Sequence, residues 1–401
     1  MKLFFYYTRN IIGLMLVLGP LCGLLLNVLT ETVPLPVWQI NSFSTVPAGA
    51  DTAGIPISSG FFILLLFLIS LLSGLLFAPV FYDFLPFRAW ISISCLFSIY
   101  GCILAKTGTE LPAIAIGICL SGMFSSGLLT VLPSSMVTGW FRMSKLPVFA
   151  VVWSVSVILA VLWFFLLQYN FSLYSLWGSL FMLCGAIFFL EKPPFPAIPT
   201  DLSVSVFHPH FLKNQERNLL RTHIFFAIIS FSLGNCLQLA DWPALMQPEN
   251  KTVSAFFPPL LLLLAAFAPY IAGAFISKKG IFSQCILQIF LAETAVMCFS
   301  SSGSLKLHIA GLLVLMLCFI MLFVTLPILI YYLYGPANYP RHSCSVWRAV
   351  PTGFLASFLC AKSSVSGYYQ VEALSLSALG LLVFSFFAIF SAWKHRLAVV
   401  S

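Results

Sequence analysis

Three ionisable side chains lie inside long apolar segments of this chain. Asp241 lies in NCLQLADWPALM, Glu293 in IFLAETAVMCF and Arg348 in SCSVWRAVPTG. A charge inside hydrocarbon is costly and usually faces a polar cavity or a partner group. Arg348 is a candidate contact for an anionic or zwitterionic ligand, because a guanidinium donates paired hydrogen bonds to carboxylates and phosphates. The alternative is that Arg348 extends to lipid headgroups.

The two acids are candidates for binding a proton or another ion. For Glu293 the competing interpretation, which we favour, is a structural hydrogen bond between helices. For Asp241 it is a place at the membrane interface beside Trp242, since tryptophan is enriched there.

Uncharged polar residues predict a cavity lining. Asn235, Gln238 and Trp242 follow a spacing of three and four residues, which places them on one face of a helix. Asn27 is the one strongly polar group of the first apolar segment. We expect these four residues and Arg348 to contact a substrate.

A short polar turn at residues 79–88, PVFYDFLPFR, separates two apolar segments. Asp83 can cap the helix that follows and pair with a nearby cation such as Arg142 or Arg88. Such a pair must break if helices separate, so these residues predict a gating element; a solvated loop acid is the alternative. The weaker copy at residues 273–280, GAFISKKG, contains Lys278 but no acid.

The composition requires that these residues sit in a membrane protein. The chain of 401 residues is 61% hydrophobic and 7% charged, with a mean hydropathy of +1.04, whereas soluble domains are about 25% charged. A membrane-spanning helix needs roughly 20 apolar residues. The sequence therefore predicts an all-α polytopic membrane protein with twelve transmembrane helices, at about 11–30, 58–80, 89–107, 112–137, 147–168, 172–190, 222–243, 254–276, 281–300, 307–334, 343–361 and 372–392.

The polar, proline-containing stretch 191–221 divides these helices. We expect a six-helix half at 1–190, a cytoplasmic linker at 191–221 and a second six-helix half at 222–401. An offset of 194 residues relates Pro133 to Pro327 and Trp153 to Trp347, which favours two pseudo-symmetric, parallel halves. The tryptophans would stack on a ring-bearing substrate or, as is commoner, pack between helices.

The distribution of basic residues predicts the orientation. With the N-terminus in the cytoplasm, fourteen Lys and Arg residues lie inside and four outside, as the positive-inside rule requires. We expect both termini in the cytoplasm, and short loops favour a bacterial inner membrane.

Together these features resemble the major facilitator superfamily. In the signature between that family's second and third helices, Asp83 matches the acid and Arg88 the last basic position, and Gly273, Lys278 and Gly280 match in the second half. The resemblance implies transport by alternating access, with a central site built largely from helices 1, 4, 7 and 10.

The match to the signature is incomplete. Pro86 replaces a glycine, Phe84 a basic residue and Ser277 an acid. The segment GLLTVLPSSMVTGWFRMSKLPVFA looks like the family's fourth helix, basic turn and fifth helix.

The expected function is that of a secondary active or facilitative transporter for a small solute, acting as a monomer among membrane lipids, with or without a co-transported proton or ion. The alternative is a lipid or lysolipid flippase of the same fold. A membrane-embedded transferase is less favoured, because His208 and His210 lack acidic partners at catalytic spacing. We expect no enzyme activity, no cofactor or metal, and no nucleic acid partner, because the basic residues are scattered.

Overall fold

The structure is a computed structural model, and it describes residues 2–32, 57–139, 146–192, 209–239, 251–300, 305–334, 339–363 and 380. Within these ranges the chain forms helices and no strand. The predicted helix at 372–392 and residues Arg142, Asp241 and Trp242 lie outside the described part.

The first group, called here the N-terminal helices, contains six α-helices and a short π-helix. Their bounds are α1 (Lys2–Thr32), α2 (Ile57–Phe84), α3 (Phe87–Thr107), α4 (Leu111–Gly139), α5 (Leu146–Tyr169), α6 (Phe171–Cys184) and η4 (Gly185–Phe189).

The second group, called here the C-terminal helices, contains the remaining described α-helices. Their bounds are α8 (Pro209–Leu239), α10 (Lys251–Lys279), α11 (Ile281–Ser300), α12 (Leu305–Tyr334), α13 (Tyr339–Trp347) and α14 (Ala349–Ser363).

Two of these helices differ from the expected spans. The α8 helix begins at Pro209, inside the stretch 191–221 that we predicted as linker; proline is compatible with the first turn of a helix, where its missing N–H is not needed. The expected helix at 343–361 is divided into α13 and α14 at Arg348. Pro351 explains the division, because it cannot donate to the carbonyl of Trp347 four residues earlier.

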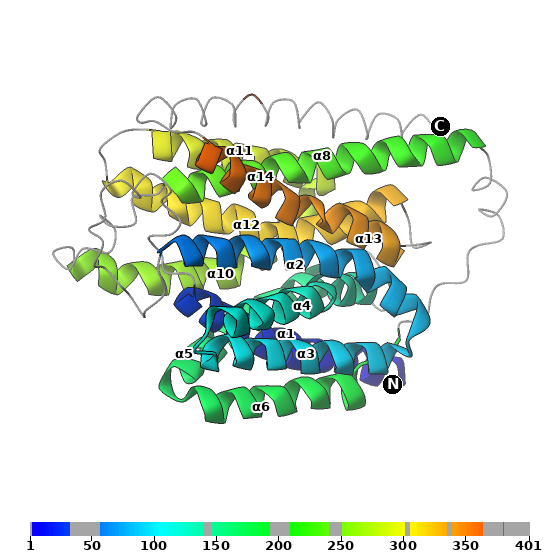
Figure 1. Ribbon diagram of the computed structural model, residues 1–401. Coiled ribbons are helices and arrows are strands. Elements are labelled where there is room, and N and C mark those ends of the chain that lie inside the picture. The colour runs from blue at the N-terminus through cyan, green and yellow to red at the C-terminus, as the bar shows by residue number, and fades with distance from the viewer. Residues whose placement is uncertain are drawn as a thin grey trace.

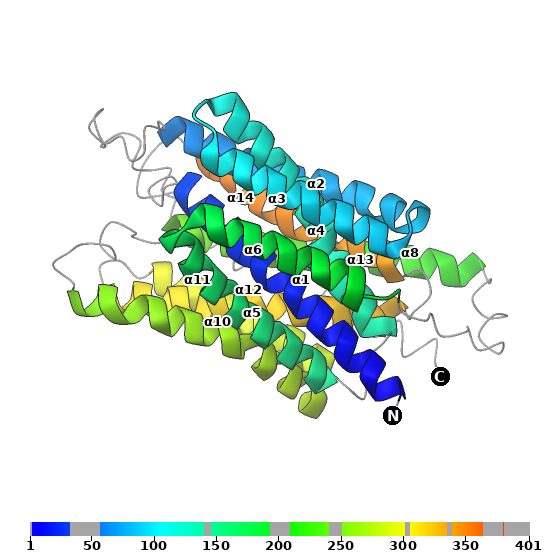
Figure 2. The same cartoon turned by 90° about the horizontal axis from the view of Figure 1, so that it is seen from below.

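The helices lie side by side along one common direction (Figure 1), with the N-terminal helices on one side of the molecule and most of the C-terminal helices on the other. Viewed from below, α6 and α1 lie in front (Figure 2). The helix pairs α1–α5, α2–α4 and α3–α4 pack together in the first group, and α8–α14, α10–α12 and α11–α12 in the second. Between the groups, α5 packs along α10, and α13 and α14 pack on α2.

The described residues include nine helical segments that are long and apolar enough to cross a membrane. Their outward faces carry large apolar side chains, for example Phe290 and Met297, each 61% exposed. Lipid solvates such faces, whereas water would not. The chain is therefore an integral, multi-pass membrane protein.

The helix bounds repeat at the offset of 194 residues. Adding 194 to α2, α3 and α4 gives 251–278, 281–301 and 305–333, which match α10, α11 and α12 within a residue. Adding 194 to α5 gives 340–363, which matches the combined range of α13 and α14, 339–363, within a residue.

One end of the bundle, called here the basic end, carries Arg9, Arg88, Lys192 and Lys278. It is the end where α1 begins and α2 connects to α3, at the right of Figure 1.

Glycines allow α3 and α4 to approach closely. A Cβ atom at Gly117 would lie 2.7 Å from the carbonyl oxygen of Gly101 and closer still to the backbone nitrogen of Ala105. Close backbone contact between small residues is a main source of helix association in lipid.

We therefore expect Gly117→Ala to destabilise the protein by about 1–3 kcal/mol, because a backbone atom must move to admit the methyl group. Thermal unfolding in detergent measures this effect. Ile116→Ala is the matched control, since Ile116 is 55% exposed on the same helix. Equal unfolding temperatures for the two variants would contradict the close approach.

Candidate functional site

Arg348 lies at the junction of α13 and α14 and connects the two groups of helices. Its Nη2 atom donates a hydrogen bond of 3.2 Å to the carbonyl oxygen of Leu75 on α2. Its Nε atom is buried and has no acceptor among the described residues. The guanidinium is thus directed at a helix of the N-terminal group, and one of its donors is available to a further acceptor.

Trp347, next to Arg348, is part of an aromatic cluster that also joins the two groups. The ring of Phe323 on α12 lies 5.2 Å from the ring of Trp153 on α5 and 5.2 Å from that of Trp347. Both tryptophans are 4% exposed. In the described part of the chain the Nε1 atom of Trp347 has no acceptor. The structure therefore packs the two repeat-related tryptophans against one shared phenylalanine.

The predicted polar lining lies at helix contacts. Asn235 on α8 is buried, and its Oδ1 atom accepts a hydrogen bond of 2.9 Å from Ser357 Oγ on α14. Asn27 is fully buried in α1. Gln238 lies in the last turn of α8. The structure thus brings Asn235 to the α14 helix that follows Arg348, while Trp242 lies outside the described residues.

Glu293 lies on the outer side of α11. It is half-buried and stands between the exposed residues Phe290 and Met297, three and four residues away. Gln284, nine residues earlier, lies on the opposite side of the helix, because each residue advances by about 100°. Glu293 therefore lies on the side of α11 that faces away from Gln284 and α12.

Two buried glutamines were not anticipated from the sequence. Gln284 and Gln288 are fully buried one turn apart on α11. Gln284 Nε2 donates to the sulfur of Met321 on α12 at 3.4 Å, and neither amide atom of Gln288 has a partner in the described ranges. Their spacing of four residues in an apolar segment was the available signal.

The charges at the basic end form an ion-pair cluster within the N-terminal helices. Glu191, just after η4, binds Arg9 of α1 at 2.9 Å and Arg88 of α3 at 3.1 Å. Both arginines also donate to backbone carbonyls near the end of η4, Arg9 to Phe188 and Arg88 to Leu190. These ion pairs and hydrogen bonds therefore connect α1 and α3 to the end of η4.

Sequence reasoning missed this cluster and misplaced Asp83. Arg88, one of two cations expected to pair with Asp83, is bonded to Glu191. Asp83 belongs to the last turn of α2, while Pro86 is the N-cap of α3, so the expectation that Asp83 caps α3 is wrong. The reason is that α2 continues to Phe84 and so includes Asp83, which lies at the negative end of the α2 dipole and not at the positive end of the α3 dipole.

Lys278 lies exposed in the last turn of α10, where a cation complements the helix dipole. Among the described residues no group of three His, Cys, Asp or Glu side chains could hold a metal ion.

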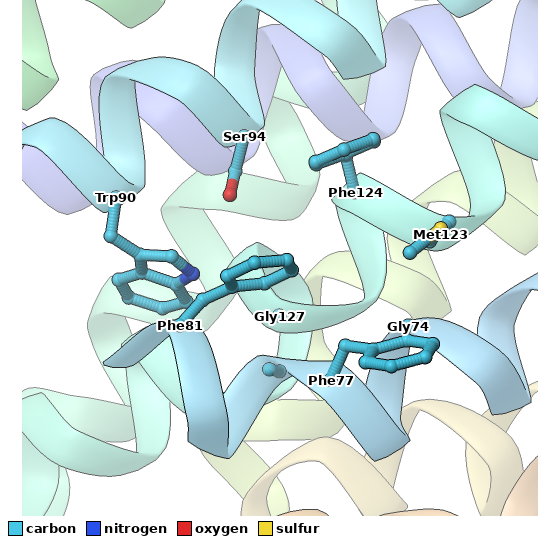
Figure 3. A pocket seen from close by; sticks show the side chains of 9 residues that line it. Gly74, Phe77, Phe81, Trp90, Ser94, Met123, Phe124 and Gly127 are labelled. Carbon is cyan, nitrogen blue, oxygen red and sulfur yellow. The ribbon is translucent and has the colours of Figure 1, made fainter. Parts of the chain in front are cut away.

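A small crevice lies between α2, α3 and α4 (Figure 3). Its volume of about 10 Å³ is room for about one water molecule. Trp90 and Ser94 come from α3, while Phe77 and Phe81 of α2 and Phe124 of α4 supply further aromatic walls. At this size the crevice does not hold an organic solute.

The long apolar helices of the described residues, arranged in two groups with a four-helix repeat, define a polytopic all-α membrane protein. The structure is similar to a crystal structure of the human organic anion transporter MFSD10 (TETRAN), with a TM-score of 0.66 and 16% sequence identity over 96% of this chain and 98% of that chain. The chain therefore shares the fold of that transporter, in agreement with the fold expected from the sequence. No protein-family model matches its sequence, and no curated protein matches it.

We expect the ion pairs of Glu191 to contribute to the free energy of unfolding. Glu191→Gln removes the shared carboxylate and leaves Arg9 and Arg88 facing each other without it, so we expect a loss of about 1–2 kcal/mol. Thermal unfolding of the purified protein measures this. Glu110→Gln, at the start of α4 on the opposite end of the bundle, is the control, and an equal effect of the two changes would show that the cluster contributes nothing particular.

Proposed function

We propose that this protein is a transporter that moves a small organic anion across the membrane by alternating access. The observation that carries the proposal is Arg348, a half-buried cation between the two groups of helices, whose Nε atom is fully buried. Such a charge inside a membrane bundle normally serves a ligand or a conformational change.

The chemistry around Arg348 favours an anion. Arg348 Nε and Trp347 Nε1 are buried N–H donors on consecutive residues, and neither has an acceptor among the described residues. Donors without acceptors are matched by a ligand that supplies oxygen lone pairs, such as a carboxylate or phosphate. The structural neighbour MFSD10 is itself described as an organic anion transporter, which supports this class of substrate.

In this proposal the halves 1–190 and 222–401 move relative to each other, and residues 191–221 connect them. The basic end faces the cytoplasm, because the excess of Lys and Arg lies there. Asn27, Asn235, Gln238 and Trp242 line the path of the substrate. Gating residues at the basic end are Asp83, Arg88, Arg142 and Lys278.

The direct test is uptake of labelled solutes into proteoliposomes that contain the purified protein. We expect uptake of organic anions and no uptake of organic cations of equal size. Arg348→Gln should reduce anion uptake at least tenfold, because it removes a charge-assisted hydrogen bond, while Arg348→Lys should keep part of it. The control is Arg221→Gln at the cytoplasmic part of α8, and equal loss in both variants would contradict a role for Arg348 in anion binding.

The same vesicles test the lipid alternative. If a fluorescent lysolipid is transferred between leaflets and no organic anion is taken up, the flippase interpretation replaces the proposal.

Coupling of transport to protons predicts that uptake depends on a pH gradient. If Glu293 or Asp241 carries the proton, an inwardly directed pH gradient should accelerate uptake, and Glu293→Gln or Asp241→Asn should remove the acceleration. Uptake measured with and without the gradient decides this. Identical rates in the unmodified protein would show facilitated diffusion instead.

A further inference from the structure

Pro79 lies inside α2, four residues after Leu75. In an α-helix the N–H of each residue bonds to the carbonyl four residues earlier. Proline has no N–H, so the carbonyl oxygen of Leu75 loses its donor within the helix. A carbonyl left without a donor inside a membrane is costly and must find one elsewhere.

Arg348 supplies that donor from the other group of helices. Its Nη2 atom binds the oxygen of Leu75 at 3.2 Å. Leu75 lies nine residues before the end of α2, and Arg348 nine residues after the start of α13, each about 13 Å along its helix. The contact therefore lies deep between the helices and not at the membrane surface.

The surroundings of the Arg348–Leu75 contact connect the same helices. Cys344 of α13 is fully buried, and α13 packs on both α2 and α8. His223 Nδ1 on α8 lies 3.0 Å from the carbonyl oxygen of Ser345. The α13 helix is thus held against α2 on one side and α8 on the other.

The 194-residue repeat relates the α2–α13 interface to the α5–α10 interface, and the Arg348–Leu75 contact belongs to the first of these. Subtracting 194 from 348 gives Ser154 on α5, and adding 194 to 75 gives Pro269 on α10. Ser154 has no guanidinium. Gly273, which corresponds to Pro79, has the N–H that can bond to the carbonyl of Pro269 within the helix. The α2–α13 interface therefore carries a charged contact that the α5–α10 interface lacks.

We propose that Pro79 is a positioning residue for Arg348: by freeing the carbonyl of Leu75 it holds the guanidinium in the state with the basic end closed. When the basic end opens, α2 and α13 separate and the guanidinium is released. A substrate anion that accepts from both Nε and Nη2 of Arg348 displaces the Leu75 carbonyl and so favours opening. This inference rests on the proposed function, because it assumes that the two groups of helices separate.

A double-mutant cycle tests the inference without a substrate. The reporter is Cys344, whose reaction with a membrane-impermeant maleimide is followed by peptide mass spectrometry in detergent-solubilised protein. Pro79→Ala restores an N–H donor for Leu75 within the helix, and Arg348→Met removes the guanidinium. A hydrogen bond from a charged group is worth about tenfold or more in an equilibrium. We expect each single change to accelerate labelling by about that factor, and the double change to add little, because both break the same bond.

Two further variants keep the test decisive. Pro20→Ala removes a proline from α1, which packs on α5 and α6, and should leave the labelling of Cys344 unchanged. Arg348→Lys keeps the charge and can still donate to the Leu75 carbonyl, but it lacks the planar guanidinium, and it should give an intermediate rate.

Unchanged labelling in Pro79→Ala, or effects of Pro79→Ala and Arg348→Met that multiply in the double variant, would overturn the role of Pro79. Because labelling needs no substrate, a failure of the proposed anion transport would appear separately, as absence of uptake with the labelling pattern intact.

Discussion

The cost of leaving a polar group without a partner inside hydrocarbon governs this structure. Water cannot supply a donor or acceptor there, so each backbone group that a proline frees and each buried charge must find a partner in the protein. Pro79 frees a carbonyl on α2, and Arg348 brings a cation into the same region from the C-terminal helices. The guanidinium of Arg348 supplies the donor that the Leu75 carbonyl lacks, and that carbonyl supplies an acceptor for the charge. The result is a hydrogen bond between the two groups of helices. A bond of this kind can be broken only if both groups find new partners, which is the property required of a contact between two conformational states.

The ion pairs at the basic end also give charged side chains partners, but these partners lie within one group of helices. The half-buried Glu191 lies close to Arg9 and Arg88, and all three side chains belong to the N-terminal helices. Their ion pairs stabilise one group of helices and do not cross to the other. The contact that does cross, between Arg348 and Leu75, is a single charge-assisted hydrogen bond beside an aromatic cluster. Strong pairing within a group and weaker contact between groups is what movement of two rigid halves requires.

Much of the fold could be predicted from the sequence because membrane helices are encoded locally. Apolar length located the described helices, and the offset of 194 residues anticipated how α2 to α5 recur as α10 to α14. The break at Arg348 was not predicted, although Pro351 is visible in the sequence, because many prolines are accommodated without a break. The start of α8 at Pro209 was missed because a polar surface helix and a linker have similar composition.

The candidate site was harder to predict, since its partners are distant in sequence. Arg348 was identified by its charge, but its acceptor is a backbone carbonyl, which has no residue type to recognise. The only sequence signal is the proline four residues after Leu75. Asp83 was expected in the turn before α3 but lies in the last turn of α2. The pairing of Arg88 with Glu191 depends on how α3 packs against the end of η4.

In the proposed mechanism the two groups of helices separate at the basic end. The most direct measurement is the distance between spin labels attached through non-natural residues at Phe84, at the end of α2, and Lys279, at the end of α10, recorded by pulsed electron resonance in lipid nanodiscs. Both positions are exposed. We expect two distance populations, with the longer one enriched in Arg348→Met. A single distance that is unchanged by Arg348→Met and by added organic anions would contradict it.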